Sequence, residues 1–291
     1  MNKINNLINI FKYRHAKIAG YFLILFPVRK FFEFYDKLTG NAVFYKKSDR
    51  YEGVLHIHPS DGIGSRISYM AQYFKHYKTN KIFVSWPAYG WVNAAFNDLF
   101  ILENHSVKEI NRYIPSESGE FNFITTELLI NIDLKYDKAP QELKSEYKEF
   151  FASLKPSQKV MQKLDEFLKK HCLKDDFTAL FIRNNCDWSM CNRHEELSCF
   201  IEALPCDKPV FLSCMNKETA AVVRKNFKGV LLELDNKNYR SMIDAVADAY
   251  IMSKAKNAVY SYGSTFCDLA YWLGGCKQKV TVIGSKDKWI R

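Results

Sequence analysis

Short hydrophobic strands alternate with amphipathic helices along most of this chain, and this alternation limits the possible fold more than any other feature. Residues 53–58 are typical of a strand, and a glycine-containing turn follows at 61–65. The next apolar residues recur at the spacing of one helix face: Ile67, Met70, Ala71 and Phe74. A second strand is predicted at 81–86. Strand, helix and strand in this order form a βαβ unit, which predicts a parallel sheet.

The same alternation returns after a charged connector at 137–155, which is predicted to be partly helical. A helix follows, with Pro156 near its start. Its buried face is predicted to carry Val160, Leu164, Phe167 and Leu168. Strands are then expected at 178–183, 209–213, 229–234, 257–261 and 279–283. Helices are expected near 217–226, 240–254 and 264–273.

These two blocks predict an α/β fold of two Rossmann-like domains with a cleft between them. We expect an N-terminal domain with its connector at 51–155 and a C-terminal domain at 156–291, preceded by a separate segment at 1–50. Ligands of such sheets bind beyond the carboxyl ends of the strands. Functional residues are therefore sought directly after each predicted strand.

The apolar stretches and cysteines indicate a cytoplasmic protein. The longest apolar candidate, 18–28, is shorter than a bilayer-spanning helix, and basic and aromatic residues rather than a cleavage site follow it. The eight cysteines are scattered without a CxxC pair. Cys186 and Cys191 lie close together, but reduced cysteines without a shared role are the favoured reading over a metal site.

The positive charge is concentrated at the N-terminus. Residues 1–50 hold ten Lys and Arg against three Asp and Glu, a net +7 of the chain's +10. Together with the nearby aromatic residues, this segment suits peripheral contact with an anionic membrane surface. One alternative is a helix that packs on the protein and keeps its charges in water. Another is a nucleic-acid binder, which rests on net charge alone and is disfavoured because no binding motif is present.

Three features after predicted strands carry candidate chemistry. The first is the turn of Asp61, Gly62, Gly64 and Arg66, which is neither a P-loop nor a complete dinucleotide fingerprint. Its glycines permit close approach of a ligand to the backbone, and a plain tight turn is the alternative. The second is Arg183, whose guanidinium can grip a phosphate with two hydrogen bonds. Its alternative is a structural pairing with Asp187 or Glu195.

The third feature is the turn of Gly263, Ser264 and Thr265, at the start of a predicted helix. Free amides and the positive end of the helix dipole make this a site for an anion such as phosphate. Simple N-capping is the alternative role of the two hydroxyls. Upstream, Asp244 and Asp248 lie one helical turn apart. Either both lie on a solvated helix face, or one of them supplies a carboxylate that accepts hydrogen bonds from the N1 and N2 donors of guanine.

This motif series resembles that of the α1,6- and nodulation-type fucosyltransferases and related O-fucosyltransferases. The shared pattern is Arg183 after a hydrophobic strand, then Asp-x3-Met-Ser-x-Ala from Asp248, a strand and Gly-Ser-Thr-Phe at 263–266. A Gly-x-Gly helix start, a strand and an aromatic segment at 84–91 and 96–100 fit the N-terminal half, so the resemblance spans roughly 53–285. The chain departs from the family pattern at two positions: Phe181 stands where the family has His, and Asn184 stands where the family has a second Arg.

The resemblance implies a GT-B-like glycosyltransferase that is inverting and independent of metal. It implies that Arg183 and Ser264 hold the diphosphate of a GDP-sugar donor, that Asp248 reads guanine, and that the loop from Gly62 to Arg66 lines the cleft. Arg66 is a further candidate to offset the charge of the leaving diphosphate. No cofactor beyond the donor substrate is implied, and the chain shows no DxD motif for a metal.

We therefore predict transfer of fucose or a related sugar from a GDP-sugar to a glycan or lipid-linked saccharide, in synthesis of a surface polysaccharide or lipopolysaccharide. The candidate proton acceptors are Asp187, Glu195 and Asp61. The alternative is a non-catalytic α/β protein that binds a nucleotide or a saccharide in the same cleft.

Overall fold

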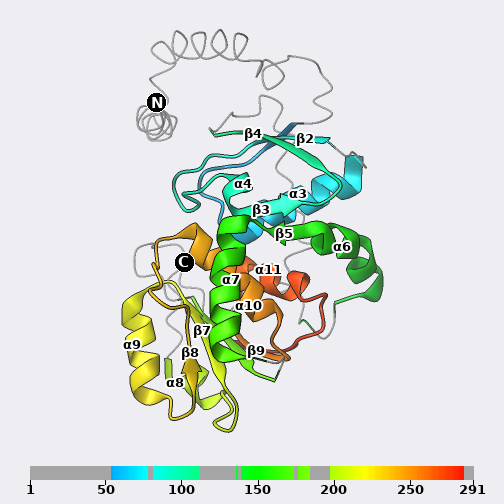
Figure 1. The fold of residues 1–291 in the computed structure, drawn as a ribbon. Coiled ribbons are helices and arrows are strands. Elements are labelled where there is room, and N and C mark those ends of the chain that lie inside the picture. The colour runs from blue at the N-terminus through cyan, green and yellow to red at the C-terminus, as the bar shows by residue number, and fades with distance from the viewer. Residues whose placement is uncertain are drawn as a thin grey trace, which may run out of the picture.

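The computed structural model describes residues 54–77, 81–111, 136, 139–173, 176–183 and 197–284. The basic segment 1–50 lies outside these residues, and so do the candidates Asp187 and Glu195. The described part contains two parallel sheets, one from each half of the chain, with helices packed around them (Figure 1).

The N-terminal half forms a three-stranded parallel sheet with β2 in the middle. Its strands are β1 (Val54–His56), β2 (Lys81–Ser85) and β4 (Ser106–Ile110). Helix α3 (Ile63–Tyr77) connects β1 to β2, which confirms the predicted βαβ unit. The four apolar residues predicted for the inner face of this helix are all buried. Strand β4 was not expected, because its sequence SVKEI is charged and only partly covered.

A short antiparallel pair lies between the two sheets and was not expected from the sequence (Figure 1). Its strands and the helices around it are α4 (Phe96–Leu99), β3 (Phe100–Leu102), α6 (Gln141–Ser153), β5 (Leu154–Pro156) and α7 (Gln158–His171). Helix α6 confirms that the connector is partly helical. Pro156 belongs to β5, and α7 begins only after Ser157, whose Oγ accepts a hydrogen bond from the amide of Val160.

The C-terminal half forms a five-stranded parallel sheet in the order β10-β9-β6-β7-β8. Its strands are β6 (Thr178–Ile182), β7 (Val210–Cys214), β8 (Leu231–Leu232), β9 (Asn257–Ser261) and β10 (Lys279–Ile283). All five predicted strands are present, although β8 is shorter than expected. The chain runs outward from β6 to β8 and then returns to β9 on the other side of β6. This reversal between β6 and β9 marks the place where such sheets bind ligands, beyond the carboxyl ends of the strands.

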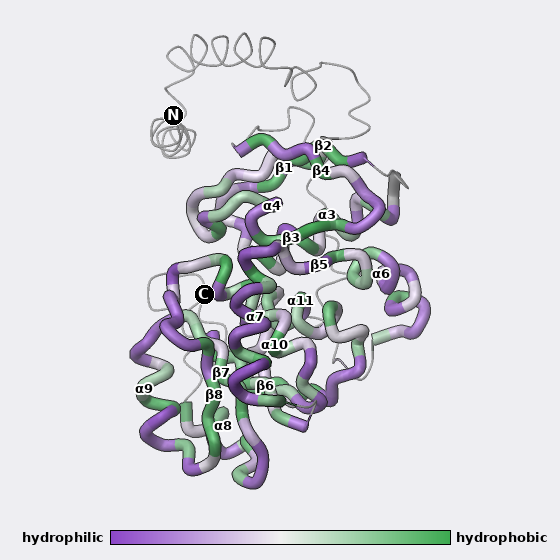
Figure 2. The backbone as a smooth tube through the Cα atoms, viewed as in Figure 1, coloured by the Kyte–Doolittle hydropathy of each residue, from purple (hydrophilic) through white to green (hydrophobic). Residues whose placement is uncertain are grey.

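Helices cover both faces of the five-stranded sheet. Besides α7, they are α8 (Leu197–Glu202), α9 (Lys217–Asn226), α10 (Met242–Ser253) and α11 (Thr265–Leu273). Leu180 and Leu212 pack with residues of α8 and α9 on one face, whereas Phe181 and Tyr260 join the core formed with α7, α10 and α11 on the other. In Figure 2, α10 and α11 are more hydrophobic than the outer helices α7 and α9.

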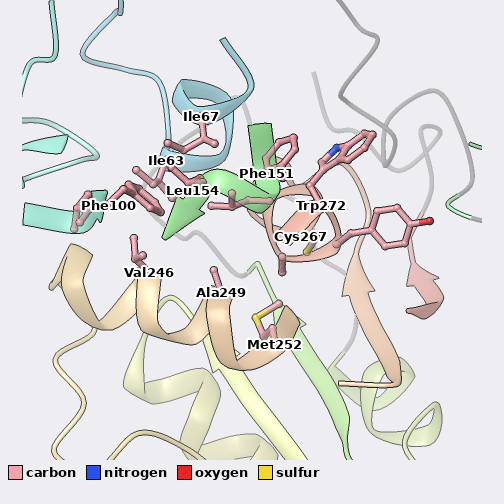
Figure 3. Close-up of a cluster of buried hydrophobic side chains, with 14 of the residues drawn as sticks. Ile63, Ile67, Phe100, Phe151, Leu154, Val246, Ala249, Met252, Cys267 and Trp272 are labelled. Atoms are coloured by element: carbon pink, nitrogen blue, oxygen red, sulfur yellow. The ribbon is translucent and has the colours of Figure 1, made fainter. Parts of the chain in front are cut away.

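One hydrophobic core joins the two halves of the molecule. Figure 3 shows Ile63 and Ile67 of α3 facing the antiparallel pair, with Val246 of α10 and Cys267 of α11 below them. Because these helices share buried side chains, the position of α3 relative to the C-terminal sheet is fixed by packing. Among the helices that the structure describes, none has the length and hydrophobicity needed to cross a bilayer.

Candidate functional site

Arg183 is held at the reversal between β6 and β9. Its backbone amide donates to Ser261 Oγ at 2.8 Å, and its Nη1 donates to the carbonyl of Gly263 at 3.3 Å. Ser261 Oγ in turn donates to the carbonyl of Phe181 at 3.3 Å. These bonds tie the end of β6 to the turn after β9, and they leave the Arg183 side chain partly exposed at the carboxyl edge of the sheet.

The turn after β9 delivers the N-terminus of α11 to the same edge. Gly263 has φ +63, a conformation that favours glycine. Ser264 is the N-cap residue, but its side chain makes no capping hydrogen bond. The amides of Cys267 and Asp268 both donate to the carbonyl of Ser264. In the part of the chain that the structure describes, the backbone amides of Thr265 and Phe266 have no backbone acceptor, as is usual in a first helical turn.

The N-terminus of α3 meets that of α11. A Cβ on Gly64 would lie 2.1 Å from the carbonyl oxygen of Thr265, so the two backbones are in direct contact. Ser65 Oγ also donates to Thr265 Oγ1 at 3.3 Å. Each helix N-terminus carries a partial positive charge, and placing two together is unfavourable unless a negative charge offsets it. Together with Arg183, this arrangement favours an anion.

Arg66 is buried behind this meeting point, with 0% of its surface exposed. Its guanidinium donates to the carbonyls of Asp61 at 2.9 Å, Pro87 at 2.8 Å and Pro59 at 3.5 Å, and lies 5.1 Å from the ring centroid of Trp86. Burial lowers its pKa to about 10, against the opposing effect of Asp61. The structure thus gives Arg66 a role in holding the loop before α3.

Asp61 lies in that loop and is partly buried. Its Oδ2 accepts a hydrogen bond from the amide of His58 at 3.1 Å. Burial raises the pKa of the Asp61 carboxyl, while the charge of His58, the bond from its amide and the charge of Arg66 oppose the rise. The neighbouring Gly62 has open space where a Cβ would stand, with no atom within 4 Å.

Asp248 is buried in α10, which excludes the alternative of a solvated helix face. It is 1% exposed, and its Oδ2 accepts from Ser213 Oγ at 2.6 Å and from Lys237 Nζ at 2.5 Å. Its Oδ1 has no hydrogen-bond partner among the residues that the structure describes. Asp244 is also buried, and its Oδ2 accepts from the amide of Asn238 at 2.7 Å. Sequence reasoning did not identify Lys237, because a lysine in a polar loop gives no signal that it is buried.

The structure therefore brings five of the candidate residues together: Arg183, Gly263, Ser264, Thr265 and Gly64. Asp248 lies on the same edge of the sheet, and Asp61, Gly62 and Arg66 form the loop before α3. Within the described ranges, no group of three or more His, Cys, Asp or Glu side chains is arranged to hold a metal ion.

The uncapped Ser264 hydroxyl gives a direct test of its role. Ser264→Ala is expected to change the stability of the protein by less than about 0.5 kcal/mol, because the hydroxyl does not cap the helix. Ser241→Ala is the matched control: Ser241 accepts from the amide of Asp244 and caps α10, so its loss is expected to cost about 1 kcal/mol. Thermal melts of both variants measure how much stability each substitution removes. Equal costs would assign the Ser264 hydroxyl to capping after all.

The fold matches solved fucosyltransferases, although no protein-family model and no curated protein matches the sequence. POFUT1 in complex with GDP superposes with a TM-score of 0.50 at 12% identity, over 80% of this chain and 99% of that one. NodZ alpha-1,6-fucosyltransferase co-crystallised with GDP gives a TM-score of 0.50 at 14% identity, over 75% of this chain and 90% of that one. The fucosyltransferase NodZ from Bradyrhizobium gives a TM-score of 0.49 at 14% identity, over 75% of this chain and 91% of that one.

The predicted fold class is thus confirmed: the chain has the GT-B-like α/β fold of fucosyltransferases. The resemblance drawn from the motifs holds at the level of the fold.

Proposed function

We propose that this chain is a glycosyltransferase that moves fucose or a related sugar from a GDP-sugar to a glycan acceptor, with inversion and without a metal. The observation that carries the proposal is the meeting of Arg183 with the N-termini of α3 and α11 at the reversal between β6 and β9. A leaving nucleoside diphosphate gains negative charge as the glycosidic bond breaks. A guanidinium and two helix dipoles fixed in advance would stabilise that charge.

Each candidate residue has a role in this proposal. Arg183 and Ser264 hold the diphosphate, and the amides at the start of α11 supplement them. Asp248 contacts the base. A carboxylate takes the proton of the acceptor hydroxyl, and Asp61, Asp187 and Glu195 are the candidates. Asp61 is the one of the three that the structure describes, and the upward shift of its pKa by burial suits a general base.

The acceptor is proposed to be a glycan or lipid-linked saccharide, and the product a surface polysaccharide or lipopolysaccharide. The basic, aromatic segment 1–50 supports this part, because it suits the surface of an anionic membrane. Sedimentation with anionic vesicles, compared between the full chain and one lacking this segment, is the relevant measurement. Equal sedimentation of the two would remove the membrane from the proposal.

A nucleotide panel tests the donor. GDP is expected to raise the melting temperature of the protein, with UDP, CDP, ADP and GMP giving smaller shifts and EDTA no change. GDP-fucose is then expected to be consumed in the presence of a suitable acceptor. Stabilisation by GDP without any transfer would favour the non-catalytic binding protein. No shift with any nucleotide would contradict the proposed site.

A further inference from the structure

The loop between β1 and α3 contains a tight turn from His58 to Asp61, and hydrogen bonds close it at both ends. The amide of Asp61 donates to the carbonyl of His58 at 3.0 Å, and the amide of His58 donates to Asp61 Oδ2 at 3.1 Å. The guanidinium of Arg66 donates to the carbonyls of Pro59 and Asp61. The backbone of the turn is therefore fixed, and the Asp61 carboxyl group is attached to it through Oδ2.

The imidazole of His58 takes part in the same turn as an acceptor. The amide of Ser60 donates to His58 Nδ1 at 3.2 Å, and Ser60 Oγ lies 2.6 Å from the same nitrogen. Because an amide N–H can only donate, these bonds assign a Nδ1 without a proton, with Ser60 Oγ as a second donor. The single proton of the neutral ring then lies on Nε2. A proton on Nδ1 would point at the Ser60 amide hydrogen and break this bond.

Asp61 keeps one carboxylate oxygen available for chemistry. Oδ1 accepts no hydrogen bond from the residues that the structure describes, and the side chain is partly exposed. Gly64, three residues further on and so at most about 11 Å away, contacts the first turn of α11. Asp61 therefore lies within reach of a sugar carried by a diphosphate at the start of α11.

We propose that His58 is a positioning residue for the general base: its neutral imidazole closes the turn through Ser60, and the turn holds Asp61 Oδ1 ready to take a proton. This inference rests on the proposed function and selects Asp61 among the three candidate bases. The acceptor oxygen bonds to the anomeric carbon of the sugar, and the acceptor proton passes to Asp61 Oδ1. The bond between that carbon and the diphosphate breaks, and its electron pair leaves with the diphosphate. Solvent then takes the proton from Asp61.

Protonation of His58 would disturb the turn, and the charges near the imidazole act on it in opposite directions. The Asp61 carboxylate favours the protonated form, whereas the Arg66 guanidinium disfavours it. Tyr69 of α3 interacts with Asp61, and Tyr89 of the loop after β2 interacts with Arg66. Burial raises the pKa of Tyr69 to about 12, so this phenol stays neutral. A histidine ordinarily gains its proton about 2.6 pH units above an aspartate, so acidification is expected to open the turn before it neutralises Asp61.

The first experiment compares the pH dependence of kcat in the wild type and in His58→Asn. The reaction is release of GDP from GDP-fucose with water as the acceptor, which needs no identified glycan. Asparagine offers Oδ1 to the Ser60 amide in place of Nδ1, but it does not take up a proton. The acidic fall of kcat is therefore expected to move to lower pH by about one to two units, because only Asp61 titrates in the variant.

His105→Asn is the matched control. His105 comes directly before β4, whereas His58 follows β1, so the two lie at opposite edges of the parallel N-terminal sheet. The Nδ1 of His105 also bonds locally, to the carbonyl of Glu103 at 2.7 Å. The same substitution there is expected to leave the pH dependence as in the wild type.

The second experiment separates positioning of the base from the integrity of the whole site. His58→Leu keeps an apolar side chain of similar size but removes the acceptor for Ser60. We expect kcat to fall roughly 10- to 100-fold, because the carboxylate is no longer held in place. Calorimetric affinity for GDP is expected to stay within about threefold, since Arg183 and the first turn of α11 are unchanged. A parallel loss of kcat and of GDP affinity would assign His58 to the fold of the site instead.

Nitrogen NMR of the full chain labelled at histidine tests the tautomer without turnover. The signals of His58 are those that disappear in His58→Asn. At pH 8 we expect a proton on Nε2 and none on Nδ1, and a proton on Nδ1 would overturn the proposal. If His58→Leu does not fold, as judged by circular dichroism, His58→Asn and the NMR measurement decide.

The outcomes separate this inference from the proposed function. The same acidic fall of kcat in the wild type and His58→Asn would overturn the role of His58 while leaving the transferase and its phosphate site intact. Release of GDP at the wild-type rate by Asp61→Asn would do the same. Failure to bind GDP, or binding of GDP without its release from GDP-fucose at any pH, would overturn the proposed function and this inference with it.

Discussion

Alanine in place of Arg183 is expected to weaken GDP binding and to slow sugar transfer together. The guanidinium stands at the carboxyl edge of the sheet beside the first turn of α11, where the proposed diphosphate gains charge during the reaction. Loss of such a group removes about 2–4 kcal/mol of transition-state stabilisation. The measurements are calorimetric titration with GDP and kcat/KM for transfer from GDP-fucose.

Two further variants isolate the cause. Arg183→Lys keeps the charge but loses the planar pair of donors, so it is expected to recover little of the activity. Lys208→Ala serves as the control, because Lys208 pairs with Asp176 just before β7 and β6 begin, at the ends of these strands opposite to Arg183. It is expected to leave both measurements unchanged. Wild-type affinity for GDP in Arg183→Ala would refute the assignment of Arg183 to the phosphates.

The parallel sheets could be predicted because their signals are local. Strands β9 and β10 and helix α9 fall at the predicted residues, since each is a short apolar run or one regular helix face bounded by polar residues. The reversal between β6 and β9, in contrast, is seen only in the order of the strands in the sheet. Arg183 and the turn at Gly263 come directly after these strands, so their shared location was also predictable.

Features that depend on distant partners were missed. Strands β3 and β5 are three residues each and pair across about fifty residues of chain, so neither carries a periodic pattern. Arginine is usually exposed, and the sequence does not indicate that Arg66 is buried. It is buried because three backbone carbonyls from two loops accept hydrogen bonds from it, and only the fold brings these loops together. Lys237 is buried for a similar reason: its partner lies in the helix that follows its loop.

Alanine in place of Gly64 is expected to destabilise the protein and to abolish GDP binding with it. The new Cβ would stand 2.1 Å from the carbonyl oxygen of Thr265 and 2.8 Å from the amide nitrogen of Phe266. Added atoms in a packed interior usually cost about 1–3 kcal/mol, and here the obstacle is backbone, which cannot rotate away. We therefore expect a cost of about 3 kcal/mol, or a melting temperature lower by roughly 6–12 °C.

Gly62→Ala separates this contact from a general effect of alanine near the start of α3. No atom lies within 4 Å of the position of its Cβ, so its cost is expected to stay below about 0.5 kcal/mol. The residues that α3 and α11 bury together, such as Ile67 and Cys267, are the same in both variants (Figure 3). Any difference between the two melts therefore reports the contact of the helix N-termini. If Gly64→Ala melts with the wild type and binds GDP normally, the two helices do not need to touch, and the anion site does not depend on their meeting.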